Sequence, residues 1–518
     1  MKENNDEKLN NGGSMPEPEL SERVNRCEKV KILRQKGVNP YPAESQRTHT
    51  IREVVDLFEN LQESKTVLTI AGRVMAKREH GGSTFVDIHD GADYIQCYFK
   101  KDALSSKNVL TYEDFLSLVD CGDFIEATGT VFLTKKGEKT LLVEKWGILT
   151  KSLLPLPKVW FGIRDQEKRY RQRYLDILLD PEIKELFLRK AIFWNSVRDF
   201  LLQKGFVEVY TPVLENTTGG ADARPFQTFH NALQIPVYLR ISMGELWQKK
   251  LMVAGFPKTF EIGRQFRNEG IDPEHLQDYT QMEFYLAYAD YRQGMALTTD
   301  LIRDVAQKTF GTLEFHSNNF HINLANDWGV IDYEEEIQRQ LGINIFNASL
   351  GDFKAKLEVL GIEYDQSAEK GRLMDLLWKH CRKSLQGPVY LTNIPVDVSP
   401  LAKRHEDNPQ KTQRFQLIIA GSELCNGYSE LNDPQDQRER FCEQAKMREV
   451  GDEEAQMFDE EFVEALEYGM PPVCGMGFSE RLFAFLEGKS VRECVMFPFL
   501  RPKEARKEQQ LKDELHDS

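Results

Sequence analysis

Residues 258–291 read KTFEIGRQFRNEGIDPEHLQDYTQMEFYLAYADY, and this stretch decides the predicted fold. It contains two runs in which apolar and polar residues alternate, as in β-strands with one face against a core. The apolar faces would hold Phe260, Ile262 and Phe266 in the first run and Met282, Phe284 and Leu286 in the second. The opposite faces would hold Glu261, Gln265 and Arg267 in the first run and Gln281, Glu283, Tyr285 and Ala287 in the second. Two adjacent strands would thus present an arginine, a glutamate and a tyrosine together, although a solvated sheet face shows the same alternation.

A third segment, RFQLIIAGSELCNGYSELND at residues 414–433, extends the pattern. Asn426, Tyr428 and Glu430 fall on one face by the period of two, and Glu423 falls on the other face unless Gly427 permits a bend. The run FQLIIAG is too apolar for a surface strand. The polar groups after it are therefore expected to line a cavity or to form a buried polar network.

Around these segments the chain shows no alternation of strands and helices of the βαβ kind, which favours an α+β fold with an antiparallel sheet and flanking helices. A long helix is expected after Asp180, a good N-cap, with Pro181 at its first position and Gly205 at its end. Its apolar stripe would be Ile183, Leu186, Phe187, Phe193, Val197, Phe200 and Leu201. Residues 300–385 contain helical stretches and are expected to form an insertion.

Residues 65–150 are a series of short β-rich segments separated by Gly, Asp and Lys turns. About five strands in about 85 residues predict a small closed barrel, for which the oligonucleotide-binding (OB) fold is the obvious type. A barrel without RNA affinity has the same composition. A charged helix over about residues 20–45, stopped at Gly37 and two prolines, is expected to precede the barrel.

The composition is that of an ordinary soluble protein, with 41% hydrophobic and 29% charged residues and a net charge of −15. No apolar run approaches the roughly 20 residues that span a bilayer. The N-terminus lacks the apolar centre of a signal peptide, and the KDEL near the C-terminus is followed by HDS, so a cytosolic protein is expected. The eight cysteines form no CxxC pair, which argues against zinc and against a disulfide framework.

A local basic cluster lies between residues 145 and 173, opposed by Asp165 and Glu167. It consists of Lys145, Lys151, Lys158, Arg164, Lys168, Arg169, Arg171 and Arg173. Charge alone leaves two interpretations open, a solvated linker and a surface for a polyanion. The chain also lacks GxxxxGK[ST] and a GxGxxG after a strand, so a bound nucleotide would have to be held by arginines.

The chain resembles the class II aminoacyl-tRNA synthetases at three motifs. FRNEG after a strand resembles motif 2, the helix and strand ending at Pro212 resemble motif 1, and GMGFSERLFAFLEG resembles motif 3 with its arginine at Arg481. Longer stretches are similar to the lysyl-tRNA synthetase family of subclass IIb: DQEKRYRQRYLD, TGGADARPFQTFHNAL, MEFYLAYADY, PVDVSPLAKR, ELCNGYSELNDPQDQ and FPFLRP. The resemblance runs from about residue 20 to about residue 502.

This resemblance implies an organisation and a set of partners. A disordered polar tail (1–18) and a helical segment (19–64) would precede an OB-fold anticodon-binding domain (65–150), a linker (151–175), a class II catalytic domain (176–502) and a charged tail (503–518). The implied activity is lysine–tRNA ligation with L-lysine, ATP and tRNA(Lys), with Mg²⁺ and no zinc. A cytoplasmic homodimer built through motif 1, with no membrane partner, is expected.

The resemblance also assigns site residues. For ATP these are Arg267, Glu269, His275, Tyr279 and Arg481, of which Arg267 and Arg481 are the expected catalytic residues. For lysine they are Gly220, Glu245, Arg267, Glu283, Tyr285, Asn426, Tyr428 and Glu430. The metal ligands would be Glu423 and Gln416, and the anticodon readers Arg78, Phe85, Gln96 and Glu138.

Four departures from the family pattern bear on these assignments. Gln416 stands where a second metal-binding glutamate is usual, and Leu276 where an asparagine is usual. Motif 3 is compressed, so either Gly475 or Gly477 could lie against the substrate. SMGELWQKK is one residue longer than usual, and the position of Glu245 depends on how that residue is accommodated.

Other functions stay open at this point. A related enzyme that lysylates a protein would lack the barrel predicted at 65–150. An aspartyl- or asparaginyl-specific relative is suggested by His275–Leu276, but it would need cations where this chain has Glu283 and Glu430. A non-catalytic RNA-binding protein on a synthetase scaffold would not need the retained arginines and carboxylates.

Overall fold

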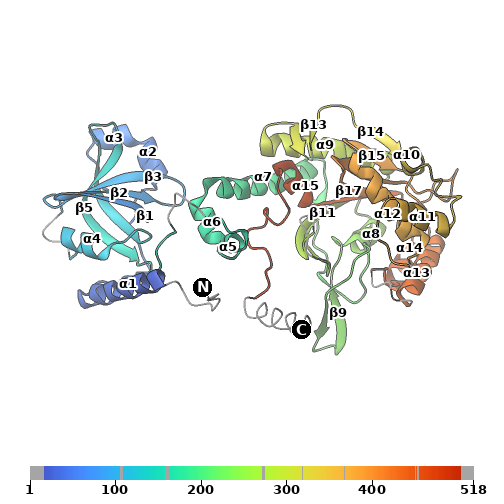
Figure 1. The fold of residues 1–518 in the computed structure, drawn as a ribbon, viewed down its shortest axis with the longest axis horizontal. Coiled ribbons are helices and arrows are strands. Elements are labelled where there is room, and N and C mark those ends of the chain that lie inside the picture. Colours follow the sequence, from blue (N-terminus) through green and yellow to red (C-terminus); the bar gives the residue numbers. More distant parts are fainter. Residues whose placement is uncertain are drawn as a thin grey trace, which may run out of the picture. The chain divides into compact units, whose positions relative to one another are not determined.

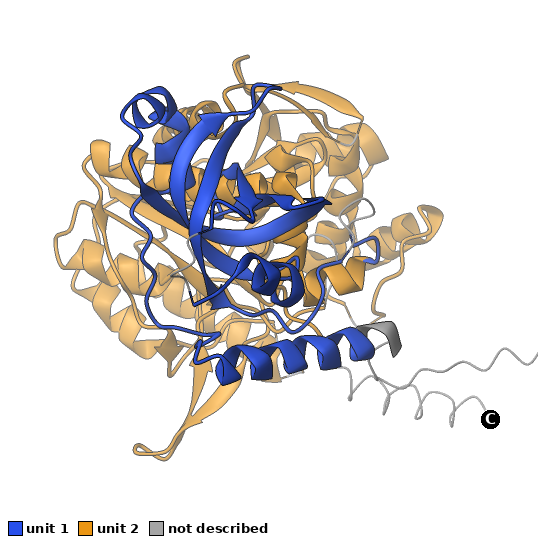
Figure 2. Ribbon diagram, turned by 90° about the vertical axis from the view of Figure 1, so that its left-hand side faces the viewer, with its two compact units in different colours: residues 1–165 blue, residues 166–518 orange. Residues whose placement is uncertain are grey.

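The computed structural model describes residues 17–104, 109–157, 163–270, 275–317, 319–366, 368–449, 451 and 454–502. The chain divides into two compact units, residues 1–165 and 166–518, drawn in different colours in Figure 2. Most of the predicted N-terminal tail and the whole predicted C-terminal tail lie outside the described residues.

The first unit is built on a closed five-stranded barrel of order β1-β2-β3-β5-β4. Its strands are β1 (Leu68–His80), β2 (Ser83–His89), β3 (Tyr94–Lys100), β4 (Phe124–Leu133) and β5 (Lys139–Thr150). All pairs are antiparallel except β3 with β5. The predicted OB-type barrel is confirmed.

Four helices accompany the barrel: α1 (Glu17–Gln35), α2 (Ile51–Asp56), α3 (Phe58–Glu63) and α4 (Tyr112–Leu118). The first ends just before Gly37, as expected. Lys151 of the basic cluster is buried, with its Nζ 2.5 Å from Asp120 Oδ2 and 2.7 Å from Asp123 Oδ2. Arg169 and Arg173, in the second unit, both pair with Asp176. Arg171 likewise pairs with Glu167, so four of the eight basic residues are engaged with carboxylates. Lys145 is exposed, and Lys158 lies outside the described residues.

The second unit contains an eight-stranded sheet of order β14-β15-β16-β17-β18-β11-β10-β6 (Figure 1). In that order the strands are Gly329–Asp332, Val389–Thr392, Arg414–Ile419, Ser422–Ser429, Val473–Ser479, Asp278–Ala287, Lys258–Phe266 and Val207–Glu208. The pairs at the two edges, β14 with β15 and β10 with β6, are parallel, and the central pairs are antiparallel. The predicted α+β class is confirmed.

Helices cover both faces of this sheet. Among them are α7 (Pro181–Gln203) and α9 (Tyr291–Phe310) on one side and α8 (Glu245–Val253) and α14 (Glu460–Glu467) on the other. The remaining helices of the described second unit are α5 (Gln166–Arg171), α6 (Arg173–Leu179), α10 (Tyr333–Leu341), α11 (Leu350–Val359), α12 (Lys370–Cys381), α13 (Pro434–Glu449) and α15 (Arg481–Glu487). Asp180 caps α7 as predicted, because its side chain accepts the backbone N–H of Glu182 at 3.0 Å. No helix in the described part of the chain is long and apolar enough to cross a membrane.

The sheet separates an apolar side from a polar one. Phe260, Met282 and Phe284 share one core with the apolar stripe of α7 and with residues of α9. The opposite side of β11 packs against α8 and α14, where Tyr285 joins a smaller core with Phe462. The predicted alternation therefore holds, and the polar face of the strands turns toward helices instead of toward bulk solvent.

The region predicted as a helical insertion contains α10, α11 and α12, which share a core of their own with β15 and β16. Two small sheets complete the unit. Their strands are β7 (Leu214–Glu215), β8 (Gln227–His230), β9 (Ile235–Leu239), β12 (Glu314–Ser317) and β13 (Phe320–Asn323).

Candidate active site

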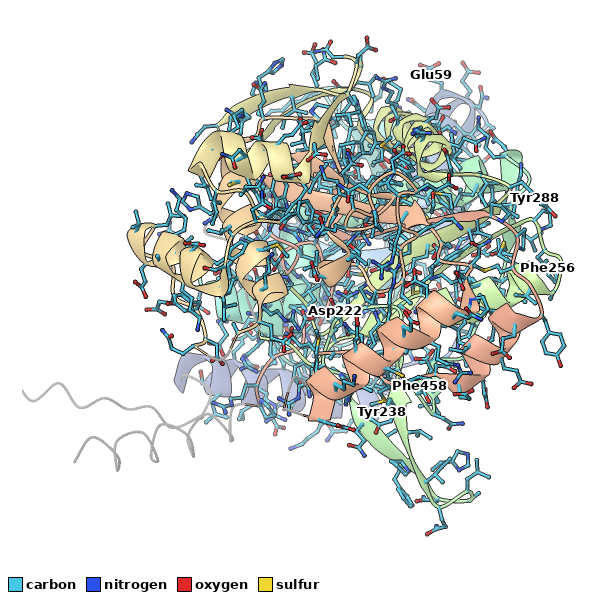
Figure 3. All side chains as sticks on the ribbon, turned by 90° about the vertical axis from the view of Figure 1, so that its right-hand side faces the viewer. Glu59, Asp222, Tyr238, Phe256, Tyr288 and Phe458 are labelled. Carbon is cyan, nitrogen blue, oxygen red and sulfur yellow. The ribbon has the colours of Figure 1, made fainter. Side chains whose placement is uncertain are left out.

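A cavity of about 340 Å³ opens in the second unit over β11, β17 and β18. Its lining includes most of the residues that the sequence nominated for ATP, lysine and the metal ion. These are Gly220, Glu245, Arg267, His275, Tyr279, Glu283, Tyr285, Glu423, Asn426, Tyr428, Glu430 and Arg481. Asp222, labelled near the centre of Figure 3, also lines it. Segments far apart in the sequence thus meet in one polar cavity, and the polar strand face is not a solvated surface.

Glu423 joins this cavity through a β-bulge. Strands β16 and β17 pair in register until Leu417 opposite Cys425, after which Ile418 faces Glu423 and Leu424 is the extra residue. The extra residue brings Glu423 to the face of Asn426 and Tyr428, because a bulge reverses the alternation. The irregularity lies at Leu424 and not at Gly427, where the sequence left a bend possible, since Gly427 is regularly paired on both sides.

One end of the cavity is acidic. Glu245, Glu283 and Glu430 are 5%, 5% and 2% exposed. Glu283 accepts hydrogen bonds from Met243 N–H (3.0 Å), the Tyr285 hydroxyl (3.0 Å) and Gln281 Nε2 (2.6 Å). A buried carboxylate needs such donors or a cation, because its desolvation is costly.

Lys249, which the sequence analysis did not single out, lies among these carboxylates. Its Nζ is 2.6 Å from Glu245 Oε1 and 2.5 Å from Glu430 Oε2, and the residue is 1% exposed. The Tyr428 hydroxyl also donates to Glu245 Oε1. The spacing of four residues between Glu245 and Lys249 on a helix was a usable signal for this ion pair.

Burial shifts the pKa values of the glutamates in this acidic part of the cavity. It raises the pKa of Glu283 to about 7, with a further increase from the negative charge of Glu245. It also raises the pKa of Glu430 well above the usual range, against the opposing effect of the Lys249 ammonium. The Glu283 carboxyl therefore titrates close to neutral pH in the free protein.

Glycines allow the carboxylates to come this close to the backbone. A Cβ on Gly475 would lie 2.1 Å from Glu430 Oε1 and 2.6 Å from Tyr285 Cε1, and one on Gly477 would lie 2.7 Å from Glu283 Cγ. Both glycines of the compressed motif thus face the acidic end. Gly244 has φ +67° and immediately precedes α8, so a left-handed residue accommodates the longer SMGELWQKK segment and Glu245 still reaches the cavity.

Two arginines nominated for ATP also line the cavity. Arg267 lies just beyond β10, where its N–H donates to Gln277 O (2.9 Å) and its Nε donates to Ile241 O (3.2 Å). Its guanidinium carbon is 5.8 Å from the centroid of the Tyr279 ring. Arg481 is the first residue of α15, and its N–H donates to Ser479 Oγ at 3.3 Å. Acidic and basic side chains thus share one cavity.

Comparison with known proteins agrees with this geometry. Residues 165–501 match the family model described as class II tRNA synthetases (D, K and N), and residues 68–149 match the model of an OB-fold nucleic acid binding domain. The chain belongs to the class II tRNA synthetases. Within this family it is similar to proteins named lysine–tRNA ligase. The one from Carboxydothermus hydrogenoformans is 44% identical over 497 residues, which are 95% of this chain and 100% of that protein. The one from Thermoanaerobacter sp. (strain X514) is 44% identical, over 94% of this chain and 97% of that protein. The one from Thermotoga maritima is 41% identical, over 93% of this chain and 97% of that protein.

In this class II synthetase two of the nominated residues do not line the cavity. Glu269 lies beyond the strand end, and its carbonyl accepts a hydrogen bond from Gln277 Nε2 at 3.3 Å. Gln416 is buried on β16, while Glu423 reaches the cavity and also contacts Arg382 Nη1 at 3.4 Å. Among the described residues, no group of three or more His, Cys, Asp or Glu side chains is arranged to hold a metal ion.

Arg414 is a cavity residue that the sequence analysis left out. Its Nε donates to Asn426 Oδ1 at 2.8 Å, and the same side chain donates to Ser399 Oγ at 3.1 Å. Arg414 therefore fixes the amide of Asn426 with its oxygen toward the guanidinium. Its position at the start of the strand RFQLII was the only sequence signal.

The barrel of the synthetase carries the four residues nominated for the anticodon. Phe85 lies on the outer face of β2 and stacks on Tyr98 with 4.6 Å between centroids, so it is not a barrel core residue. Gln96 Oε1 accepts from Thr140 Oγ1 at 3.1 Å, and Arg78 forms a two-pronged pair with Asp87 at 2.6 and 2.7 Å. Glu138 is exposed in the turn between β4 and β5.

Proposed function

We propose that the chain is a lysine–tRNA ligase, which condenses lysine with ATP to lysyl-adenylate and diphosphate and then transfers lysine to the 3′ end of tRNA(Lys). The observation that carries this proposal is the cluster of three buried carboxylates, Glu245, Glu283 and Glu430, in the cavity that Arg267 also lines. The family model covers aspartate, lysine and asparagine enzymes, so the charge of this cluster selects among them.

The acidic end suits the two ammonium groups of lysine. A compact ammonium on a flexible stem is costly to take out of water without anionic partners. Glu283, Glu430 and the Tyr285 phenol receive the side-chain ammonium, and Glu245 receives the α-ammonium. Asn426 contributes to holding the carboxylate, and Gly220 and Tyr428 complete the wall. An aspartate side chain at the same position would meet carboxylates of its own charge.

Arg267 and Arg481, which both line the cavity, suit the phosphates of ATP. Arg267 binds the α-phosphate together with the substrate carboxylate, and Arg481 binds the more distant phosphates of a bent nucleotide. Tyr279 lies beside the adenine. Glu269 and His275 are further contacts of the nucleotide.

Adenylate formation needs little beyond this arrangement. The carboxylate of lysine is ionised at neutral pH and attacks the α-phosphorus in line, so no general base is required. Arg267 and Arg481 hold and neutralise the phosphates as charge develops on diphosphate. Glu423 fits a Mg²⁺ ion carried by ATP, since Mg²⁺ in nucleotide sites is held by one or two carboxylates and the phosphates, and such an ion supplies further charge neutralisation. Gln416 remains a weaker second candidate.

The barrel serves the second step by selecting the tRNA. Single-stranded bases are read by stacking on aromatic rings and by hydrogen bonds at their edges. Phe85 provides the ring, and Gln96, Glu138 and Arg78 provide polar groups on the same barrel. A barrel matched over residues 68–149 also disfavours a relative that lysylates proteins.

The assembly expected for this function is a cytoplasmic homodimer. Helix α7 exposes three large apolar side chains, Leu188, Ile192 and Leu202. Apolar residues on the outer face of a motif 1 helix are what a two-fold interface would cover.

Amino-acid-dependent exchange between ATP and diphosphate tests the proposal. The purified chain should exchange with lysine and not with aspartate or asparagine. Exchange with aspartate or asparagine alone would favour the other members of the family. Absence of exchange with all three amino acids would favour a non-catalytic RNA-binding role.

A further inference from the structure

Lys249 is buried against the acidic residues of the cavity, although it does not itself line the cavity. It lies one helical turn after Glu245 on α8, and its ammonium joins Glu245 to Glu430 across the cavity wall. The ammonium also lies 5.4 Å from the ring centroid of Tyr428 and 5.8 Å from that of Phe462. The Lys249 ammonium is thus held between the carboxylates of Glu245 and Glu430 and the rings of Tyr428 and Phe462.

The negative charges of Glu245, Glu283 and Glu430 are matched by an equal number of positive charges only when Lys249 is counted with the substrate. Of the six described acidic residues that line the cavity, three act on one another electrostatically, Glu245, Glu283 and Glu430. The substrate of the proposed function brings an α-ammonium, a side-chain ammonium and a carboxylate, and that carboxylate faces Arg267. Two substrate ammonium groups and Lys249 then make three cations for three anions, which avoids an uncompensated buried charge.

We propose that Lys249 is a positioning and specificity-determining residue of the amino-acid pocket, because it pairs with one oxygen of Glu245 and one of Glu430 and leaves the other oxygens for the two ammonium groups of the substrate. This inference rests on the proposed function. An amino acid with an uncharged side chain would leave one carboxylate of the pocket without a cation. An additional cation on the substrate would find no carboxylate left.

Removal of Lys249 should therefore change how the pocket titrates. Three carboxylates would then face two ammonium groups, so one carboxyl would retain a proton until higher pH. The charged and titratable groups that act on Glu430 and Glu283 from the surrounding elements are Glu245 and Lys249 on α8, Arg267 after β10, Tyr279 and Tyr285 on β11, Tyr428 on β17 and Cys474 on β18.

The test compares Lys249→Met with a matched control on the same helix. Lys250→Met also removes a lysine from α8, but Lys250 lies 4.6 Å from the Trp247 ring and pairs at 3.8 Å with Glu461, which is not a residue of the cavity lining. The KM for lysine, the KM for ATP and kcat are measured by exchange of ATP with diphosphate from pH 6 to 9.

Lys249→Met should raise the KM for lysine about tenfold or more, with the KM for ATP changed less than about twofold. It should also move the acidic limb of kcat/KM for lysine to higher pH by about one unit. Lys250→Met should match the unaltered chain in both respects. Lys249→Arg keeps the positive charge, so the acidic limb of kcat/KM should return to its original pH. The guanidinium group is larger than the ammonium, so the KM for lysine should stay raised.

Methionine leaves two carboxylates without their cation, so this variant can fail to fold. Lys249→Gln retains a donor and removes only the charge, and the inference expects the same displacement of the acidic limb for it. A folded glutamine or methionine variant with unchanged KM for lysine and an unchanged limb overturns the inference, even if its melting temperature falls. Absence of lysine-dependent exchange by the unaltered chain would instead overturn the proposed function and the inference with it.

Discussion

The hydroxyl of Tyr285 donates a hydrogen bond of 3.0 Å to Glu283 Oε2, and the two residues lie on the same face of β11. This bond favours the ionised carboxylate, in opposition to burial, which raises the pKa of Glu283. The Tyr285 phenol therefore helps to keep Glu283 ionised, which is the state that pairs with the substrate ammonium.

Tyr285→Phe should raise the KM for lysine by roughly fivefold to tenfold, because a donor to a charged acceptor is lost. The KM for ATP should stay within about twofold. Kinetics of lysine-dependent exchange measure both. Tyr390→Phe is the matched control: Tyr390 is also buried and hydrogen-bonded, to Met295 O at 2.9 Å, but it lies outside the cavity. An equal effect of the control on the KM for lysine would contradict the role of Tyr285.

Glu430→Gln should raise the KM for lysine strongly and leave ATP binding nearly unchanged. The substitution removes a charge that faces the substrate ammonium, a loss typically of about 2–5 kcal/mol when one partner of a buried charge pair is removed. Binding of lysine and of ATP can be measured separately by calorimetry. An equal loss of affinity for ATP would show that Glu430 does not serve the amino acid.

The pH dependence of lysine use should follow the titration of Glu283. Its pKa is raised to about 7, by burial first and then by Glu245. Below that pH the free enzyme carries a protonated Glu283, which must lose its proton before it can pair with an ammonium. Hence kcat/KM for lysine should fall as the pH drops below about 7, by up to about tenfold per unit, and level off above it. The parameter kcat/KM for ATP at saturating lysine should lack this limb.

Gly475→Ala should abolish lysine activation. A Cβ there would lie 2.1 Å from Glu430 Oε1, so Glu430 or the strand must move. Gly351→Ala is the control, because a Cβ on Gly351 meets only Ser349 Oγ at 3.6 Å and alanine suits a helix. Exchange assays and melting temperatures of both variants give the comparison. An active Gly475→Ala enzyme with a normal KM for lysine would contradict the geometry.

Phe85→Ala should spare adenylate formation and weaken only the charging of tRNA. The loss of one stacked base typically costs about 1–3 kcal/mol. Tyr94→Ala is a suitable control, since Tyr94 is an exposed aromatic residue of the same barrel that stacks on His89 at 4.2 Å and was not nominated as an anticodon reader. Damage to the exchange reaction by Phe85→Ala would argue against a separate anticodon module.

Much of this architecture could be predicted from short stretches of the sequence. The alternation in β10 and β11 separated Met282 and Phe284 from Glu283 and Tyr285 because side chains alternate across a strand. The N-cap at Asp180 was readable because a short polar side chain satisfies the free N–H groups of a helix start. The five barrel strands followed from turn residues at regular spacing.

The sequence by itself thus determined the two kinds of domain and the α+β class, and most of the residues it nominated for ATP and lysine do line the cavity. Only the tertiary structure decided that Leu424 forms a bulge that turns Glu423 inward, that Gly244 adopts a left-handed conformation before Glu245, and that Lys249 joins Glu245 to Glu430. The physical reason is that periodicity depends on residues a few positions apart. A bulge or a buried charge balance depends instead on groups that are brought together from distant parts of the chain.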